Sequence, residues 1–271
     1  MIDKLILGRY IPRDSYVHRM DARAKLLLSI AYIAIIFLAG NWEGYLVMAI
    51  FTIGVIHLTN IPLKVYIKGV KPLIWLISFT VVLQMLFSTT GVVWFHLGPI
   101  NITNDGVVNG AYVFIRFVLI IMMSTILTLT TQPLAVADAI EYLLMPLRKV
   151  KFPVYEIALM LSIALRFVPT LMDETEKIMN AQRARGVDFA NGNVFQRMKA
   201  VVPLLIPLFT SSMKRAIELG DAMEARGYRG GEGRTKYRIL KWHMRDTWAV
   251  VAYVVLVVVL IGLKYYLPVG I

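Results

Sequence analysis

Five long apolar runs, each about the length of a membrane-spanning helix, constrain what this chain can fold into. Four of the runs contain no charged side chain, and the remaining one, Val107–Thr131, contains only Arg116. A charge at the middle of a bilayer costs about 3 kcal/mol or more, and a helical span needs about 20 mostly apolar residues. The runs are Leu26–Trp42, Gly44–Asn60, Pro72–Ser88, Val107–Thr131 and Thr247–Leu263. The sequence therefore predicts an all-α integral membrane protein with about five transmembrane helices, in keeping with a composition that is 58% hydrophobic.

Lysine and arginine alternate between the two sides of these predicted spans. Six precede the first span, three lie in residues 61–71 and eighteen lie in residues 132–246, whereas residues 89–106 contain none. Basic residues accumulate in cytoplasmic loops. We therefore expect a cytoplasmic N-terminus and a C-terminus outside. The basic N-terminal arm has no apolar segment before the first span, so it is not a cleavable signal peptide.

The long segment between the fourth and fifth spans is too apolar for an ordinary soluble domain. The chain is accordingly divided into residues 1–131, with the N-terminal arm and four spans, residues 132–246, with a helical scaffold on the cytoplasmic side, and residues 247–271, with the last span. Apolar residues at intervals of three and four predict three long amphipathic helices in this scaffold, at residues 133–147, 153–185 and 194–226. Prolines inside the second and third helices should kink, bend or split them: Pro169, Pro203 and Pro207.

The pattern Ala-x-x-Ala-Arg-Gly ends both of the longer scaffold helices, at Ala181–Gly186 and at Ala222–Gly227. Glycine suits the left-handed position just past a helix end, and arginine complements the negative end of the helix dipole. Capping alone would explain one copy. Two copies at equivalent points of two similar helices favour docking into partner grooves, where small alanines permit close approach and the guanidinium meets carboxylates or carbonyls.

Three parts of the chain resemble the transmembrane T component, the EcfT family, of energy-coupling factor (ECF) type ABC transporters. They are Val17–Leu27, Ala164–Pro169 and the two Ala-Arg-Gly ends. Met20 and Ala22 depart from the leucine and proline that this family often has at these positions. The paired helix ends are the more specific part of the resemblance.

The resemblance implies a coupling subunit of a prokaryotic plasma-membrane importer for vitamins or other micronutrients. Its partners would be two ABC ATPase subunits, one substrate-binding S component and the lipid bilayer. The three scaffold helices would then be coupling helices that transmit ATP-driven motion to the S component. The implied ATPase-docking residues are Ala184, Arg185, Gly186, Ala225, Arg226 and Gly227. The transported substrate is not indicated, because specificity in this family belongs to the S component.

Several chemistries are disfavoured by the composition. The chain contains no Gly-x-x-x-x-Gly-Lys-Ser/Thr phosphate loop, so ATP is expected to bind partner subunits and no cofactor is expected here. It has no cysteine, and its four histidines are far apart, so we expect neither a metal site nor catalytic residues. The formal net charge of +12 is interpreted as membrane orientation rather than nucleic-acid binding.

Three charged residues fall within apolar segments: Arg116, Glu156 and Arg166. Such groups are costly unless they face the bundle interior or a partner. A structural ion pair and a contact with the S component are equally compatible with the sequence.

Two other function classes are less well supported. An integral membrane enzyme acting on lipid-linked substrates could use Asp173, Glu174 and Glu176, but these acids have no histidine or Asp-x-x-Asp pair nearby. A self-contained secondary transporter would be expected to have matched halves, and the lopsided 132–246 segment gives no such symmetry.

Overall fold

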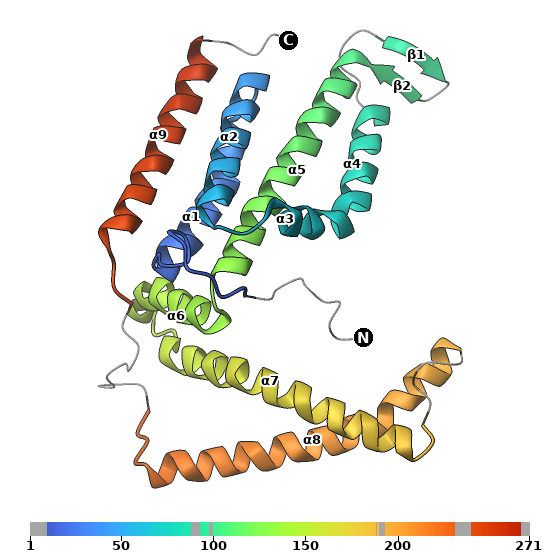
Figure 1. The fold of residues 1–271 in the computed structure, drawn as a ribbon, viewed down its shortest axis with the longest axis vertical. Helices are drawn as coiled ribbons and strands as arrows, with labels where there is room; N and C mark the ends of the chain where they lie inside the picture. Colours follow the sequence, from blue (N-terminus) through green and yellow to red (C-terminus); the bar gives the residue numbers. More distant parts are fainter. Residues whose placement is uncertain are drawn as a thin grey trace. The chain divides into compact units, whose positions relative to one another are not determined.

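The computed structural model describes residues 10–87, 93–97, 100–187, 189, 193–230 and 240–266. These residues form nine α-helices and one short β-hairpin (Figure 1). The chain divides into two compact units. The first unit contains residues 1–139 and 240–271, and the second contains residues 140–239.

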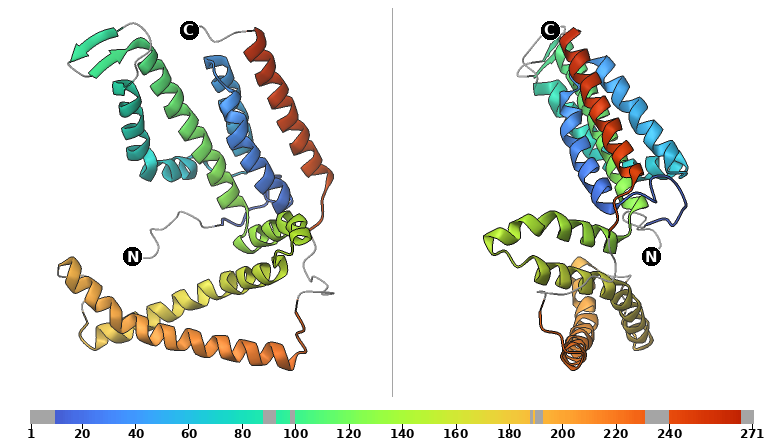
Figure 2. Two further views of the ribbon diagram at one scale, coloured as in Figure 1. Left: turned by 180° about the vertical axis from the view of Figure 1, so that it is seen from behind. Right: turned by 90° about the vertical axis from the view of Figure 1, so that its left-hand side faces the viewer.

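The first unit is a helical bundle with the long helix α5 at its centre (Figure 2). Its helices are α1 (Ala22–Ile35), α2 (Trp42–Leu58), α3 (Leu63–Val70), α4 (Ile74–Phe87), α5 (Asn104–Thr130) and α9 (Met244–Tyr266). Helices α1 to α4 each pack against α5, and α9 packs against α1 and α2. The helix α6 (Pro133–Leu144) begins in this unit, where Ala135 and Ala139 pack on Ala22 of α1.

Small residues let the helices of this bundle approach closely. A Cβ built on Gly110 of α5 would lie 3.1 Å from the Met85 side chain of α4, and one on Gly69 of α3 would lie 3.2 Å from Thr125 of α5. Buried hydroxyls also pair, as between Tyr32 and Thr52 at 2.6 Å. Close backbone approach and interhelical hydrogen bonds are how helices associate in lipid, where the hydrophobic effect between helices is absent.

The structure differs from the sequence prediction in one short segment. Strands β1 (Val93–Leu97) and β2 (Ile100–Thr103) form an antiparallel hairpin that precedes α5, although the sequence analysis predicts no strand. Thr103 then caps α5 by accepting a hydrogen bond from the Gly106 N–H at 3.1 Å. The described residues are otherwise helical, with connecting turns and caps.

Five helical stretches are long and apolar enough to cross a membrane by length and composition: Leu63–Phe87, Asn104–Thr130, Val154–Ala184, Met198–Ala225 and Met244–Tyr266. The first, second and fifth of these correspond to the third, fourth and fifth predicted spans. The first two predicted spans fall on α1 with its 3-10 extension to Leu38 and on the shorter apolar α2. The other two stretches are scaffold helices that the sequence analysis places outside the bundle of spans.

The second unit is built on two long helices, α7 (Val154–Ala184) and α8 (Val194–Ala225). Pro169 lies inside α7, and Pro203 and Pro207 lie inside α8, without ending either helix. The prediction that proline could split them is therefore wrong. In Figures 1 and 2 the first turns of α8 run in a different direction from the rest, so a bend occurs instead.

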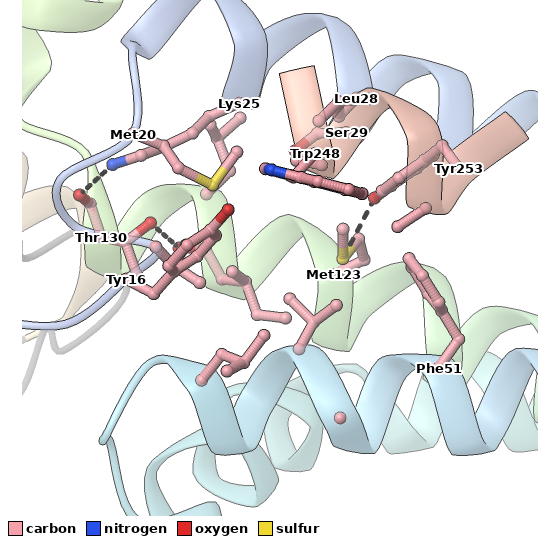
Figure 3. Close-up of a pocket in the computed structure, with 18 of the residues that line it drawn as sticks. Tyr16, Met20, Lys25, Leu28, Ser29, Phe51, Met123, Thr130, Trp248 and Tyr253 are labelled. Carbon is pink, nitrogen blue, oxygen red and sulfur yellow. Dashed lines mark hydrogen bonds between the residues drawn. The ribbon is translucent and has the colours of Figure 1, made fainter. Parts of the chain in front are cut away.

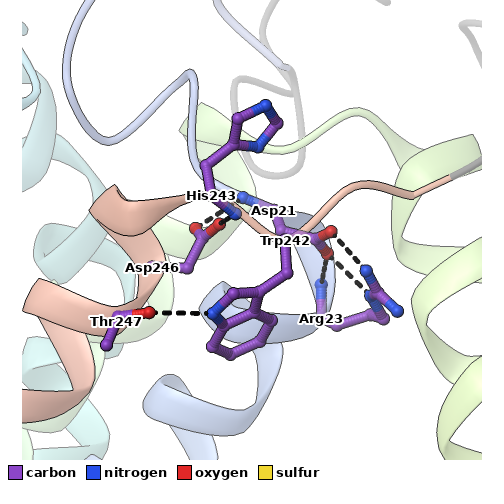
Figure 4. Close-up of polar contacts among 6 residues, drawn as sticks. All are labelled: Asp21, Arg23, Trp242, His243, Asp246 and Thr247. Carbon is purple, nitrogen blue, oxygen red and sulfur yellow. Dashed lines mark hydrogen bonds and ion pairs between the residues drawn. The ribbon is translucent and has the colours of Figure 1, made fainter.

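A buried carboxylate joins the start of α9 to the start of α1 (Figure 4). Asp246 is fully buried, and its two oxygens accept the N–H of Asp21 at 2.9 Å and the N–H of His243 at 2.8 Å. The second bond is a helix N-terminal cap, in which an acid in the first turn reaches back to the residue before the helix. One side chain thus caps α9 and fixes the residue that precedes α1.

Asp21 caps α1 in a similar way. Its carboxylate accepts the backbone N–H of Arg23 at 2.8 Å, as an N-cap does, and forms an ion pair with the Arg23 guanidinium at 2.8 Å. Both side chains are buried. The segment Val17–Leu27 therefore has a structural role, because it links the N-terminal arm to α9.

Candidate docking site at the two long-helix ends

The end of α7 is closed by a Schellman motif. The N–H of Val187 donates to the Gln182 carbonyl at 3.0 Å, and the N–H of Gly186 donates to the Arg183 carbonyl at 2.9 Å. Gly186 has φ +87°, in the left-handed region that glycine occupies without steric cost. Arg185 is therefore the C-cap that directly follows the helix, and its N–H donates to the Ala181 carbonyl at 3.2 Å.

The end of α8 has the same hydrogen-bond pattern. The N–H of Tyr228 donates to the Met223 carbonyl at 3.0 Å, the N–H of Gly227 donates to the Glu224 carbonyl at 2.8 Å, and Gly227 has φ +72°. The predicted left-handed glycines are confirmed at both ends. The repeated sequence thus produces the same local structure twice, with Arg226 in the position that Arg185 holds on α7.

The six residues predicted to dock are all exposed. Within the part of the chain that the structure describes, neither the Arg185 nor the Arg226 guanidinium has a hydrogen-bond or ion-pair partner. Neither guanidinium takes part in the backbone cap beside it. Each therefore keeps its five N–H donors for a planar acceptor such as a carboxylate or a pair of carbonyls.

A polar contact holds the two long helices where they cross. The Arg215 guanidinium donates to Glu174 at 2.8 Å, and the Ser211 hydroxyl donates to the other oxygen of the same carboxylate. Nearer the end of α7, the Gln182 amide donates to the Pro203 carbonyl at 3.4 Å. The Pro203 carbonyl is free to accept because the residue four positions further along α8 is Pro207, which lacks the N–H that would bond to it.

The crossing lies at the same sequence distance from both arginines. Arg185 follows Glu174 by eleven residues, and Arg226 follows Arg215 by eleven residues. Eleven residues make about three helical turns, so each arginine lies close to the helix face of its crossing residue and about 16 Å along the axis. The two helices run in opposite directions through the crossing, and the arginines therefore lie on opposite sides of it.

The structure places the three charged residues of the apolar segments in different surroundings. Arg116 donates to the Tyr45 hydroxyl at 3.0 and 2.6 Å, and its guanidinium lies 4.9 Å from the centre of the Phe37 ring. It is thus satisfied inside the bundle by a hydroxyl and aromatic rings. Glu156 and Arg166 are exposed on α7, and no described residue pairs with either. Their proposed contacts with an S component stay predictions.

The acidic cluster of the alternative enzyme hypothesis has no catalytic geometry. Glu174 is engaged by Arg215 and Ser211, and Asp173 and Glu176 are exposed on α7. Among the described residues, no group of three or more histidine, cysteine or acidic side chains could hold a metal ion.

Two functional arrangements were missed by sequence reasoning. Asp246 could have been recognised as a cap, since it stands in the first turn before an apolar run. The contact between Glu174 and Arg215 has no local signal, because the residues are 41 positions apart.

Together, the long apolar helices and their exposed aromatic and aliphatic side chains define a multi-pass membrane protein. On α4, for example, Trp75 is 80% exposed and Phe87 is 71% exposed, as lipid-facing residues of a span are. The paired helix ends add two exposed arginine side chains, Arg185 and Arg226.

Comparison with known proteins identifies the family. The family model described as CbiQ, cobalt transport protein, matches residues 13–237. The energy-coupling factor transporter transmembrane protein EcfT of Lacticaseibacillus paracasei is 64% identical over 245 residues, which cover 90% of this chain and 93% of that protein. EcfT 1 of Listeria monocytogenes is 59% identical over 264 residues, covering 97% and 99%, and EcfT of Bacillus subtilis is 51% identical over 264 residues, covering 97% and 100%.

The chain therefore belongs to the CbiQ family, and within it to the EcfT transmembrane T components of ECF transporters. It is a multi-pass plasma-membrane protein and a member of a transporter complex with other components.

Proposed function

We propose that this T component couples two ABC ATPase subunits to one substrate-binding S component of an importer for vitamins or other micronutrients. Arg185 with Ala184 and Gly186 docks to one ATPase, and Arg226 with Ala225 and Gly227 docks to the other. The observation that carries this proposal is the repeated Schellman end, which presents an exposed, unpartnered arginine on each of two crossed helices.

The crossing of α7 and α8 is the physical reason for two separate docking surfaces, one on each ATPase. Because Glu174 and Arg215 join the helices midway between the two arginines, a change in the separation of the two ATPases changes the angle between α7 and α8. The exposed apolar face of α8, which includes Ile206 and Phe209, would carry this motion to the S component. The T component itself hydrolyses no ATP and needs no cofactor.

Charge reversal at the tips tests this proposal. Arg185→Glu and Arg226→Glu should each weaken co-purification with the ATPases, and the double variant should lose assembly and uptake. A carboxylate at either position would be repelled by a negatively charged docking surface on the ATPase and by the negative end of the helix dipole. Lys177→Glu on α7 and Lys214→Glu on α8 are matched controls, since both lysines are exposed and make the same change of charge. Normal assembly of the double tip variant would contradict the docking model.

The orientation is proposed separately. The basic N-terminal arm and residues 132–246 lie on the cytoplasmic side and the C-terminus lies outside. The chain contains no cysteine, so single cysteines can be introduced without background labelling. A cysteine at Lys214 should react with a membrane-impermeant maleimide only after cells are opened, whereas one at Tyr265 should react in intact cells. The reverse result would overturn the orientation.

A further inference from the structure

The chain passes between the two units twice, and one N-terminal segment contacts both passages. The chain leaves the first unit inside α6, after Ala139, and returns to it at Leu240, shortly before α9. Residues 11–25, the linking segment, end in the first turn of α1 and bond to residues beside both places. Because α6 continues across the boundary without a break, a movement of the second unit enters the bundle through this helix.

The linking segment is fixed to the end of α5 and the start of α6. The Ile11 N–H donates to the Leu129 carbonyl at 3.0 Å. The Lys25 ammonium donates to the Thr130 carbonyl at 2.9 Å (Figure 3). These carbonyls belong to the last turn of α5, where no helical N–H remains to bond them. Ala22 packs against two alanines of α6, so the segment follows a displacement of the first turns of α6.

The same segment is fixed to the start of α9. The Tyr16 hydroxyl donates to the Arg245 carbonyl at 2.9 Å. The Asp21 N–H donates to the buried Asp246 carboxylate at 2.9 Å. Lys25 acts on this side too, because the carboxylates of Asp246 and Asp21 attract its charge. This buried cation therefore serves both the end of α5 and the start of α9.

Packing around the first turns of α9 is interrupted by a cavity of about 600 Å³ (Figure 3). The cavity lies among α1, α2, α5 and α9, and Tyr16, Met20 and Trp248 are among the residues that line it. Side chains beside a cavity lack the dispersion contacts that a filled core would give them. The polar contacts of the linking segment therefore contribute much of what fixes the start of α9.

We propose that the linking segment is a positioning element for the coupling, which transmits movement of α6 to the start of α9. The two passages of the chain then move as one piece, and α5 and α9 are displaced together when the scaffold moves. This inference rests on the proposed function, because the ATPases supply the movement. The side chains that carry it are those of Tyr16 and Lys25, which act through the helices that they contact.

Two tyrosine substitutions make a matched pair for the test. Tyr16→Phe removes the hydroxyl that bonds to Arg245, at the start of α9. Tyr32→Phe removes a buried hydroxyl that bonds to Thr52, between α1 and α2. Lys25→Met removes the charge shared by α5 and α9. Tyr16 is 37% exposed, so Tyr16→Phe leaves the core intact and tests the inference even where Lys25→Met does not fold.

The assembled transporter, with cysteine-free partner subunits, would carry spin labels at Leu134 and Met244, which are exposed on α6 and α9. Distances between the labels would be measured with and without a non-hydrolysable ATP analogue. We expect one narrow distance distribution in wild type and in Tyr32→Phe, unchanged by the analogue. Tyr16→Phe and Lys25→Met should give broader distributions that shift when the analogue is added.

A second pair of labels, at Lys177 of α7 and Lys214 of α8, reports whether the ATPases move the scaffold. If this pair does not respond to the analogue in wild type, the proposed function is contradicted, and the widths measured without the analogue still test the linking segment. The inference is overturned if the distributions of Tyr16→Phe and Lys25→Met stay as narrow and as unresponsive as that of Tyr32→Phe. A shift of the distance between α6 and α9 in wild type would also overturn it.

Discussion

Substitution of Asp246 is the most stringent test of how the first unit is held together. Its carboxylate accepts one N–H from Asp21 and one from His243, and it is fully buried. Asp246→Ala leaves the buried Asp21 N–H without an acceptor, which costs about 1–3 kcal/mol. It also removes the cap of α9, which costs about 1 kcal/mol more. We expect the free energy of unfolding to fall by about 2–4 kcal/mol.

Asp246→Asn should be intermediate, because the amide oxygen can still accept one N–H while the amide nitrogen faces the other donor. Thermal unfolding in detergent measures the loss, and hydrogen exchange locates it, since the amide of Asp21 should exchange faster in Asp246→Ala. Asp221→Ala, at an exposed acid of α8, is the control. If Asp246→Ala lowers the midpoint no more than this control and the Asp21 amide stays protected, the inferred role of the carboxylate is wrong.

Three further outcomes are expected. Glu174→Gln should widen the distribution of distances between spin labels on α7 and α8, and Glu174→Arg with Arg215→Glu should restore it, as a swapped ion pair would. Gly186→Ala and Gly227→Ala should each destabilise the adjacent helix end by about 1 kcal/mol, because open space surrounds each position and only the positive φ opposes a side chain. Amide hydrogen exchange should become faster at that helix end alone. Burial lowers the pKa of His18, and the hydrogen bond to the Ile11 carbonyl opposes this shift. The contribution of neutral His18 to stability is therefore present above the pKa of the unfolded state and is lost as pH falls through the pKa of the folded state. His18→Gln should reduce the dependence of the unfolding midpoint on pH between pH 7.5 and 5.5, and an unchanged dependence would contradict this role.

The helices could be located from the sequence because a bilayer restricts where charge can lie. The third span was predicted to begin at Pro72, and helix α4 begins two residues later at Ile74, after the separate helix α3 and a 3-10 turn at Lys71–Leu73. The same criterion placed the start of the last span too late. Helix α9 begins at Met244 because Asp246 satisfies the backbone of its first turn, and a charge-based boundary at Thr247 excludes that residue.

The hairpin before α5 was missed because a short apolar run has no clear period. Val93–Leu97 has five residues, too few to distinguish a strand from a helix turn, and the Gly98-Pro99 dipeptide after it was the available turn signal. The helix-end motif was found because capping depends on a few consecutive residues. Pairings across the fold could not be found in this way, since Asp21 and Asp246 are 225 positions apart.

In the proposed docking model, the placement of the crossing gives a reason for the equal spacing between each arginine and the crossing residue of its helix. A shift of one residue between Glu174 and Arg185 would rotate that arginine by about 100° around the α7 axis, which would turn the guanidinium away from the face that carries the crossing. Eleven residues instead return each arginine to within about 20° of its crossing residue. The two arms are equal in length on α7 and α8, so a change in the angle between the helices about the contact between Glu174 and Arg215 displaces Arg185 and Arg226 by equal amounts. Two ATPase subunits that move symmetrically would therefore act on the crossing as a balanced pair, and the asymmetry needed to move one S component must come from the rest of the unit. The bend in the first half of α8, where Pro203 and Pro207 lie, is an asymmetry that α7 does not share in the same place.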